Sequence, residues 1–229
     1  MLIGYVADER YLALADVNLE FEQDGRMVAV TRSTARGGVY AELKPGDYRV
    51  TLQKDGFGPK SVTMTVADQQ PYLFRLLSNR LVGYAWPKWV KSGERSEFRV
   101  NAVEPYRLSL WRYGLHKEPV QPIGWFDEHG PRATMQVTPD GDYTQTGIQF
   151  NRRGYFSSHH GQMIAAPERS GLYYFHAEAE SGASFTFPWV VATAVPQAPI
   201  AVLASTITWN AYNNFGGRSN YIKIGRAHV

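Results

Sequence analysis

The sequence predicts a mainly β protein: two tandem β-sandwich domains, followed by the first strand and motif of a truncated α/β domain. Short segments of alternating apolar residues, separated by turn sequences, run through residues 1–78 and are typical of β-sandwiches. Closely spaced prolines in residues 79–197 exclude long helices and favour short or edge strands. A continuous apolar run, Ile200–Ala204, then indicates a strand covered on both faces, as in α/β sheets.

Composition narrows the class of protein. The chain has 229 residues, of which 44% are hydrophobic and 14% aromatic, which is enough to fill one or two domain cores. The net charge of +3 comes from dispersed basic residues, so we expect no nucleic-acid partner. Cysteine is absent, which excludes disulfides and thiolate zinc sites. Neither a signal sequence nor a membrane-length apolar run is visible, so we expect a cytoplasmic protein without membrane contact.

Residues 1–78 carry the clearest strand signals. Apolar residues alternate in five segments, which are Val17 to Phe21, Val28 to Val30, Val39 to Ala41, Tyr48 to Leu52 and Val62 to Val66. Good turn sequences separate them: Asp24-Gly25, Gly37-Gly38, Pro45-Gly46-Asp47 and Asp55-Gly56. This region resembles the carboxypeptidase regulatory-like, transthyretin-like fold in Gly4-x-Val6-x-Asp8, Leu43-x-Pro45-Gly46-x-Tyr48-x-Val50 and Gly56-Phe57. The resemblance implies an accessory β-sandwich domain.

Three aspartates of this region allow two interpretations. Asp8, Asp16 and Asp24 have the carboxylates that calcium prefers, but they lack the spacing of an EF-hand loop. Aspartate is also a common turn residue. We therefore expect turn or surface roles.

Residues 79–197 form the second predicted β domain, after a short polar joint at Ser78-Asn79-Arg80. Strands are expected at Phe98–Val103, Tyr106–Tyr113, Ala133–Val137, Gln162–Ala165, Leu172–Ala179 and Ser184–Ala192. The aromatic residues of this domain could fill cores and interfaces, or they could form a sugar-stacking platform; they are Trp86, Trp89, Trp111, Trp125, Phe126 and Trp189. His159-His160 could ligate one metal only from a loop, because adjacent strand residues face opposite ways.

The stretch Thr206–Tyr221 mixes aromatic rings, amides and a glycine pair directly after the apolar run. Such a mixture suits the crevice beyond the carboxyl end of a strand, where open α/β sheets bind ligands. Gly216-Gly217 lacks the lysine of a P-loop and the third glycine of a dinucleotide motif. No Gly-x-Ser-x-Gly elbow follows a predicted strand, so the sequence does not predict a catalytic triad with a serine nucleophile.

This stretch resembles the signature of the N,N-dimethylformamidase large (beta) subunit family, through Trp209, Ala211, Tyr212, Asn213, Phe215, Gly216, Gly217, Ser219 and Tyr221. Earlier segments also resemble this family and occur in the same order along the chain: Val90 to Glu94, Leu108 to Gly114, Ser170 to Tyr173 and Pro188 to Val191. The resemblance implies that residues 198–223 open an α/β catalytic domain holding one iron ion through tyrosine phenolates and a glutamate. It implies Tyr212 as a metal ligand, with Asn210, Asn213, Asn214 and Arg218 as orienting groups for ligand or substrate.

Two functions follow as alternatives. The first is the N-terminal fragment of an iron-dependent hydrolase of small linear amides, assembled as a homo- or hetero-oligomer and inactive as a fragment. Residues 224–229, Ile-Gly-Arg-Ala-His-Val, would then be a sequencing-adapter artefact, since a codon string resembling a sequencing adapter would encode these residues. The second is a non-catalytic two-module protein that binds carbohydrate or another protein through exposed aromatic residues.

Overall fold

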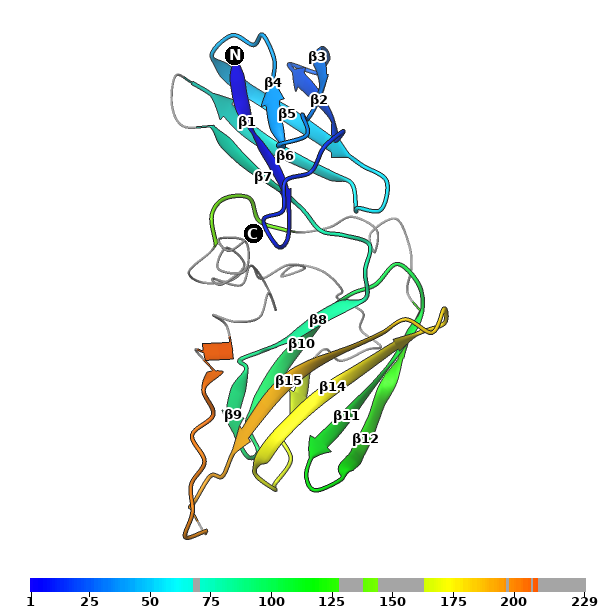
Figure 1. The fold of residues 1–229 in the computed structure, drawn as a ribbon, viewed down its shortest axis with the longest axis vertical. Coiled ribbons are helices and arrows are strands. Elements are labelled where there is room, and N and C mark those ends of the chain that lie inside the picture. Colours follow the sequence, from blue (N-terminus) through cyan, green and yellow to red (C-terminus); the bar gives the residue numbers. More distant parts are fainter. Residues whose placement is uncertain (68–70, 128–137, 144–162, 197, 207, 210–229) are drawn as a thin grey trace, which may run out of the picture. The chain divides into compact units, whose positions relative to one another are not determined.

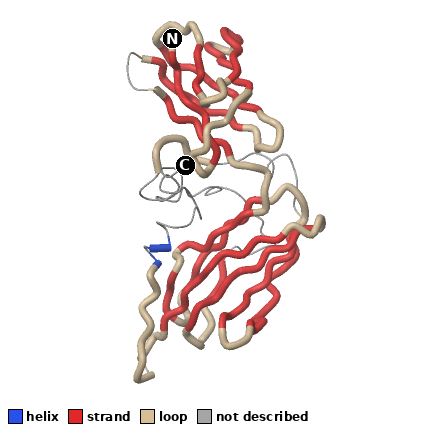
Figure 2. The backbone as a smooth tube through the Cα atoms, in the orientation of Figure 1, coloured by secondary structure: helices blue, strands red, loops and turns tan. Residues whose placement is uncertain are grey.

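The computed structural model describes residues 1–67, 71–127, 138–143, 163–196, 198–206 and 208–209. These residues fall into two compact units. The first contains 1–67, 71–79 and 138–143, and the second contains the remaining described residues. Nearly all regular structure in both units is strand (Figure 2). The prediction of a mainly β protein is therefore confirmed.

The first unit is built from two sheets (Figure 1). One has the order β4-β1-β7, with β1 and β7 parallel, and the other is antiparallel with the order β3-β2-β5-β6. The strands are β1 (Leu2–Asp8), β2 (Asn18–Gln23), β3 (Arg26–Arg32), β4 (Gly38–Tyr40), β5 (Gly46–Gln53), β6 (Lys60–Val66) and β7 (Tyr72–Leu76).

Alternation in the sequence explains how these two sheets share one core. Leu19 and Phe21 from β2, Val50 from β5 and Phe74 from β7 are all fully buried in one apolar cluster. Strand β3 departs from the prediction. A register shift opposite Phe21 and Glu22 turns Ala29 toward the core and leaves Val28 and Val30 about half exposed, because a bulge reverses which residues face inward.

The second unit also contains two sheets. The smaller has the order β13-β10-β8, and the larger has the order β12-β11-β14-β15-β9, in which only β15 and β9 are parallel. The strands are β8 (Val82–Trp86), β9 (Trp89–Lys91), β10 (Arg95–Asn101), β11 (Tyr106–Tyr113), β12 (Lys117–Phe126), β13 (Met163–Ala165), β14 (Gly171–Ala179) and β15 (Ser184–Ala192).

Aromatic rings fill the space between these two sheets. Phe175 on β14 stacks on Phe187 of β15 with ring centroids 4.8 Å apart, and it also contacts Phe98 of the smaller sheet. Trp189 is fully buried, and its indole N–H donates to the Ser96 hydroxyl at 2.8 Å. Ser96 in turn donates to the carbonyl of Pro87 at 2.9 Å. One buried chain of hydrogen bonds therefore joins the two sheets across this core.

Prolines act here as the sequence analysis expected. Strand β12 contains Pro119 and Pro122, and it lies at the edge of the larger sheet. The register of β12 against β11 shifts twice, close to the two prolines. Proline lacks the N–H that a central strand needs, so it is confined to edges and bulges. The predicted strand at Ala133–Val137 lies outside the described residues.

The run Ile200–Ala204 is not the buried strand that the sequence predicted. It has no strand pairing, and Ile200, Val202 and Leu203 are at least 80% exposed. A strand of this apolar type needs partners on both edges and cover on both faces, and the described residues supply none around it. Within the described part of the chain, no helix is both long and apolar enough to cross a membrane.

The buried chain at Trp189 allows a test of the second core. Ser96→Ala removes the acceptor of the Trp189 indole N–H and the hydroxyl that donates to the Pro87 carbonyl. We expect a loss of about 1–3 kcal/mol in the free energy of unfolding, measured by urea denaturation, because the indole N–H of the fully buried Trp189 loses its acceptor. Ser184→Ala at the exposed start of β15 is the control. Equal stability of the two variants would contradict this role of Ser96.

Candidate functional site

The residues that the sequence assigned to an iron site lie outside the described part of the structure. These are Tyr212, with Asn210, Asn213, Asn214 and Arg218, and the pair His159-His160 lies outside it as well. Trp209, at the start of the motif, is helical and donates its backbone N–H to the Ser205 carbonyl at 3.0 Å. Among the residues that the structure describes, no three His, Asp or Glu side chains are grouped as metal ligands.

The three N-terminal aspartates have turn roles, as expected. Asp8 Oδ1 accepts the backbone N–H groups of Arg10 and Leu12, each at 2.8 Å. Asp16 and Asp24 have positive φ angles of 54° and 50°, a conformation that aspartate tolerates in turns. Asp24 and Gly25 lie between β2 and β3.

The predicted aromatic set divides between core and surface. Trp189 and Phe126 belong to the apolar core, with 0% and 6% of their surface exposed. Trp86 and Trp89 are exposed, whereas Trp111 and Trp125 are half-buried. The core interpretation therefore holds for Trp189 and Phe126, and the sugar-stacking interpretation stays a prediction for the exposed members.

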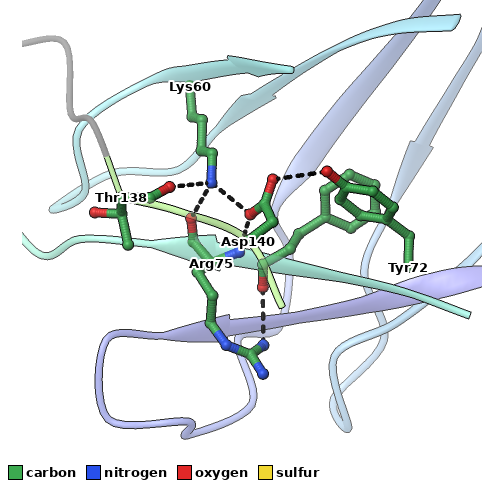
Figure 3. Close-up of polar contacts among 6 residues, drawn as sticks. Lys60, Tyr72, Arg75, Thr138 and Asp140 are labelled. Atoms are coloured by element: carbon green, nitrogen blue, oxygen red, sulfur yellow. Dashed lines mark hydrogen bonds and ion pairs between the residues drawn. The ribbon is translucent and has the colours of Figure 1, made fainter. Parts of the chain in front are cut away.

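A buried polar cluster in the first unit surrounds Lys60, at the start of β6 (Figure 3). The Lys60 ammonium donates to the carbonyl oxygens of Arg75 at 3.1 Å and Thr138 at 2.5 Å. It also forms an ion pair with Asp140. The side chains of Lys60 and Asp140 are only 6% and 10% exposed, so solvent screens this pair weakly.

Asp140 belongs to a segment that closes the outer edge of β7. We call residues 138–143 the edge segment. Asp140 Oδ1 accepts the backbone N–H of Arg75 at 2.7 Å, and Asp140 Oδ2 accepts the Tyr72 hydroxyl at 3.1 Å. Gly141 donates its backbone N–H to the Leu73 carbonyl at 2.9 Å. The edge segment thus pairs with backbone groups of β7 that would otherwise be open to another chain.

The far end of the edge segment is held by Tyr11. The backbone N–H of Tyr143 donates to the Tyr11 hydroxyl, and the Arg75 guanidinium lies over the Tyr11 ring at 4.1 Å. Tyr11 has a φ angle of 64°, which is uncommon for a bulky residue. The loop after β1 therefore takes part in the same cluster as β6, β7 and the edge segment.

The geometry gives Lys60 a structural role and no catalytic one. Burial lowers the pKa of Lys60, and the Asp140 carboxylate opposes that shift. A catalytic lysine base or nucleophile requires a free lone pair and access for a substrate. All three ammonium donors of Lys60 already have protein acceptors. The cluster therefore fastens the edge segment to the sandwich.

Sequence reasoning missed this cluster, although a signal for it existed. Val62, Met64 and Val66 alternate on β6, and Lys60 occupies the next position of the same alternation. A lysine in an inward position requires a buried partner. Asp140 lies 80 residues away, and nothing local in the sequence connects the two.

The ion pair gives a prediction about stability. Asp140→Ala leaves the Lys60 charge buried without its counter-ion, so we expect a loss of about 3 kcal/mol in the free energy of unfolding. The double variant Lys60→Met with Asp140→Ala should recover part of that loss, because it removes the uncompensated charge. Urea denaturation measures both, with Asp55→Ala at an exposed turn as control. A double variant less stable than Asp140→Ala alone would contradict the pairing.

Tyr72 gives a prediction about alkaline pH. Burial, with the neighbouring Asp140 carboxylate, raises the pKa of Tyr72 to about 12 from 10.0. The folded protein therefore keeps this proton after the unfolded chain has lost it, and the resulting stability is lost as pH rises from 10 to about 12. We expect the free energy of unfolding to fall more steeply in this window for the wild type than for Tyr72→Phe. Parallel curves would show that Tyr72 titrates normally.

Comparisons with known proteins relate the C-terminal half of the chain to one family. The family model described as N,N-dimethylformamidase beta subunit-like, C-terminal, matches residues 120–228. The match includes the edge segment, strands β13 to β15 and the Thr206–Tyr221 motif. No curated protein matches the chain.

Solved structures offer only distant likenesses. A DUF3823 family protein from Bacteroides ovatus is 11% identical, with 80% of this chain and 97% of that chain covered and a TM-score of 0.27. The major pilin subunit of Bacillus cereus is 11% identical, with 82% and 68% covered and a TM-score of 0.28. Fibronectin(III)-like modules of Clostridium thermocellum CbhA are 12% identical, with 87% and 95% covered and a TM-score of 0.23.

TM-scores this low carry no conclusion about ligand or activity. The family model is different, because its matched range includes the motif on which the resemblance was drawn. The comparisons therefore support a relation of residues 120–228 to the N,N-dimethylformamidase beta subunit-like family.

Proposed function

We propose that this chain is the N-terminal, accessory part of an iron-dependent hydrolase that acts on small linear amides. The observation that carries the proposal is the family-model match over residues 120–228, which spans the Thr206–Tyr221 motif. The two β units precede or surround this motif in the chain, and among their described residues no three His, Asp or Glu side chains are grouped as metal ligands. The catalytic site would be assembled from Tyr212 and residues of the hydrolase that this chain does not contain.

Tyr212 is the residue of this chain that would hold the metal. A bound cation stabilises the phenolate form of tyrosine, and hard anionic oxygen suits oxidised iron. Iron would supply Lewis-acid polarisation of an amide carbonyl. One donor is not a complete site, so the remaining ligands would come from other residues. Asn210, Asn213, Asn214 and Arg218 would orient Tyr212 or the substrate through hydrogen bonds.

The proposal includes the partners that the family resemblance implies. The substrate would be a small amide, and the complete hydrolase would be a homo- or hetero-oligomer. Neither nucleic acid nor membrane is among the proposed partners, since the charge of +3 is dispersed along the chain.

The test uses protein expressed from the complete source gene. We expect the wild type to hold iron and to show the visible absorption of an iron–phenolate bond. Tyr212→Phe removes the phenolate, so most of the iron and the absorption should be lost. Tyr40→Phe, at an exposed position of β4, is the matched control and should keep both. Unchanged iron content and absorption in Tyr212→Phe would contradict the assignment of Tyr212.

A binding function is the second candidate, and one observation favours it. Exposed or half-buried aromatic residues lie on the solvent side of the larger sheet in the second unit. Accessory β domains can carry a binding surface beside a catalytic domain, so this function does not exclude the first.

A further inference from the structure

The larger sheet of the second unit carries a band of rings on the face that points away from the apolar core. Residues that pair across strands share a face. Trp111 on β11 pairs with Pro119 on β12 and with Tyr174 on β14, and Tyr174 pairs with Pro188 on β15. We call these four residues the aromatic row. Tyr113, two positions beyond Trp111, lies on the same face.

This face differs from an ordinary solvent-facing sheet, in which polar residues alternate with buried apolar ones. Leu108, Leu110, Phe175 and Phe187 already fill the inward positions of these strands. The rings of the aromatic row are therefore not needed for that core. The same face continues toward the opposite sheet edge through Val190 and its partner Trp89, which is 55% exposed. An apolar band of this kind on the surface marks an interaction site.

The rings are held in fixed positions. Trp111 stacks on Tyr174 with an interplanar angle of 17° and ring centroids 6.3 Å apart. The ring centroids of Tyr113 and Tyr174 are 4.5 Å apart. Tyr174 is 6% exposed, so it supports the two outer rings. The Trp111 indole N–H donates to Ser109 Oγ at 2.9 Å, which satisfies its polar edge. A ligand would meet preformed ring surface and would have little side-chain freedom to restrict.

Neutral polar groups border the aromatic row. Ser109, His176 and Thr186 each lie two residues from a member of the aromatic row on the same strand. They pair with one another across β11, β14 and β15. The side chains of His176 and Thr186 have no hydrogen-bond partner among the described residues. Arg107 lies two residues before Ser109 on β11, and its guanidinium carbon is 5.3 Å from the centroid of the Trp125 ring. The surface thus combines ring faces with the hydrogen-bonding groups of His176 and Thr186. The charged residues of this face lie outside the row, at Arg107 and Glu178 and at Lys117 beside Tyr113.

We propose that the aromatic row is a binding site for a β-1,4-linked pyranose oligosaccharide. Such a chain is neutral, and its sugar rings present apolar faces with hydroxyl groups at their edges, so it matches ring surface beside Ser109, His176 and Thr186. The row crosses four strands, which is roughly 14 Å at the usual strand spacing. That length fits a short run of sugar units lying across the strands. The site goes beyond the proposed hydrolase function and does not depend on it.

The test is binding of the full chain to cellohexaose and xylohexaose, measured by isothermal titration calorimetry. Trp111→Ala and Tyr113→Ala should each weaken binding about tenfold or more, because each removes a stacked ring. Trp111→Phe should recover part of the loss. Trp86→Ala is the matched control, because Trp86 is a 49% exposed tryptophan on β8 of the other sheet. Unfolding midpoints of all variants separate loss of a ligand contact from loss of the fold.

Two results would overturn the proposal. The wild type could bind neither oligosaccharide, or Trp111→Ala and Tyr113→Ala could both bind as the wild type does. The first result could come with self-association of the wild type, detected by light scattering, that Tyr113→Ala abolishes. That result would show that the face is an interface between protein chains.

Discussion

The buried ammonium of Lys60 imposes the constraint on which the first unit depends. A charge inside a β-sandwich is tolerated only when acceptors surround it, and strands β6 and β7 provide just one, the Arg75 carbonyl. The other two come from Thr138 and Asp140 of the edge segment. The edge segment lies inside the range that matches the N,N-dimethylformamidase beta subunit-like family. Part of the matched range therefore completes the N-terminal sandwich.

The second unit differs from the first in where its aromatic residues lie. Its strands carry aromatic residues on both faces of one sheet, and only the inner set, around Phe175, Phe187 and Trp189, is required for the core. The outer set at Trp111, Tyr113 and Tyr174 is rigid but not buried as a whole. A rigid ring surface lowers the entropic cost of binding. We therefore place the proposed binding site on the second unit, whereas the structural ion pair lies in the first.

Strand identity could be predicted from the sequence wherever alternation was regular. Tyr106–Tyr113 and Ser184–Ala192 match β11 and β15 at both ends, because inward positions in both strands are apolar. Strand β12 was missed because Pro119 and Pro122 hide its pattern, and the phase of β3 was wrong because a bulge is invisible in single-residue patterning. The Lys60–Asp140 contact depends on tertiary structure alone. For the iron ligands, a family resemblance at Tyr212 was the signal available from the sequence. Tyr212 lies outside the described residues, so its assignment stays a prediction.

Amide hydrogen exchange at two positions tests most directly whether the edge segment completes the first sandwich. The Arg75 N–H donates to Asp140, and the Gly141 N–H donates to the Leu73 carbonyl. In the full chain under native conditions, both amides should exchange as slowly as those of β2 and β5, because opening either bond would expose the Lys60 charge pair. Exchange of both amides at the rate of an unstructured peptide, with β2 and β5 still protected, would contradict the account.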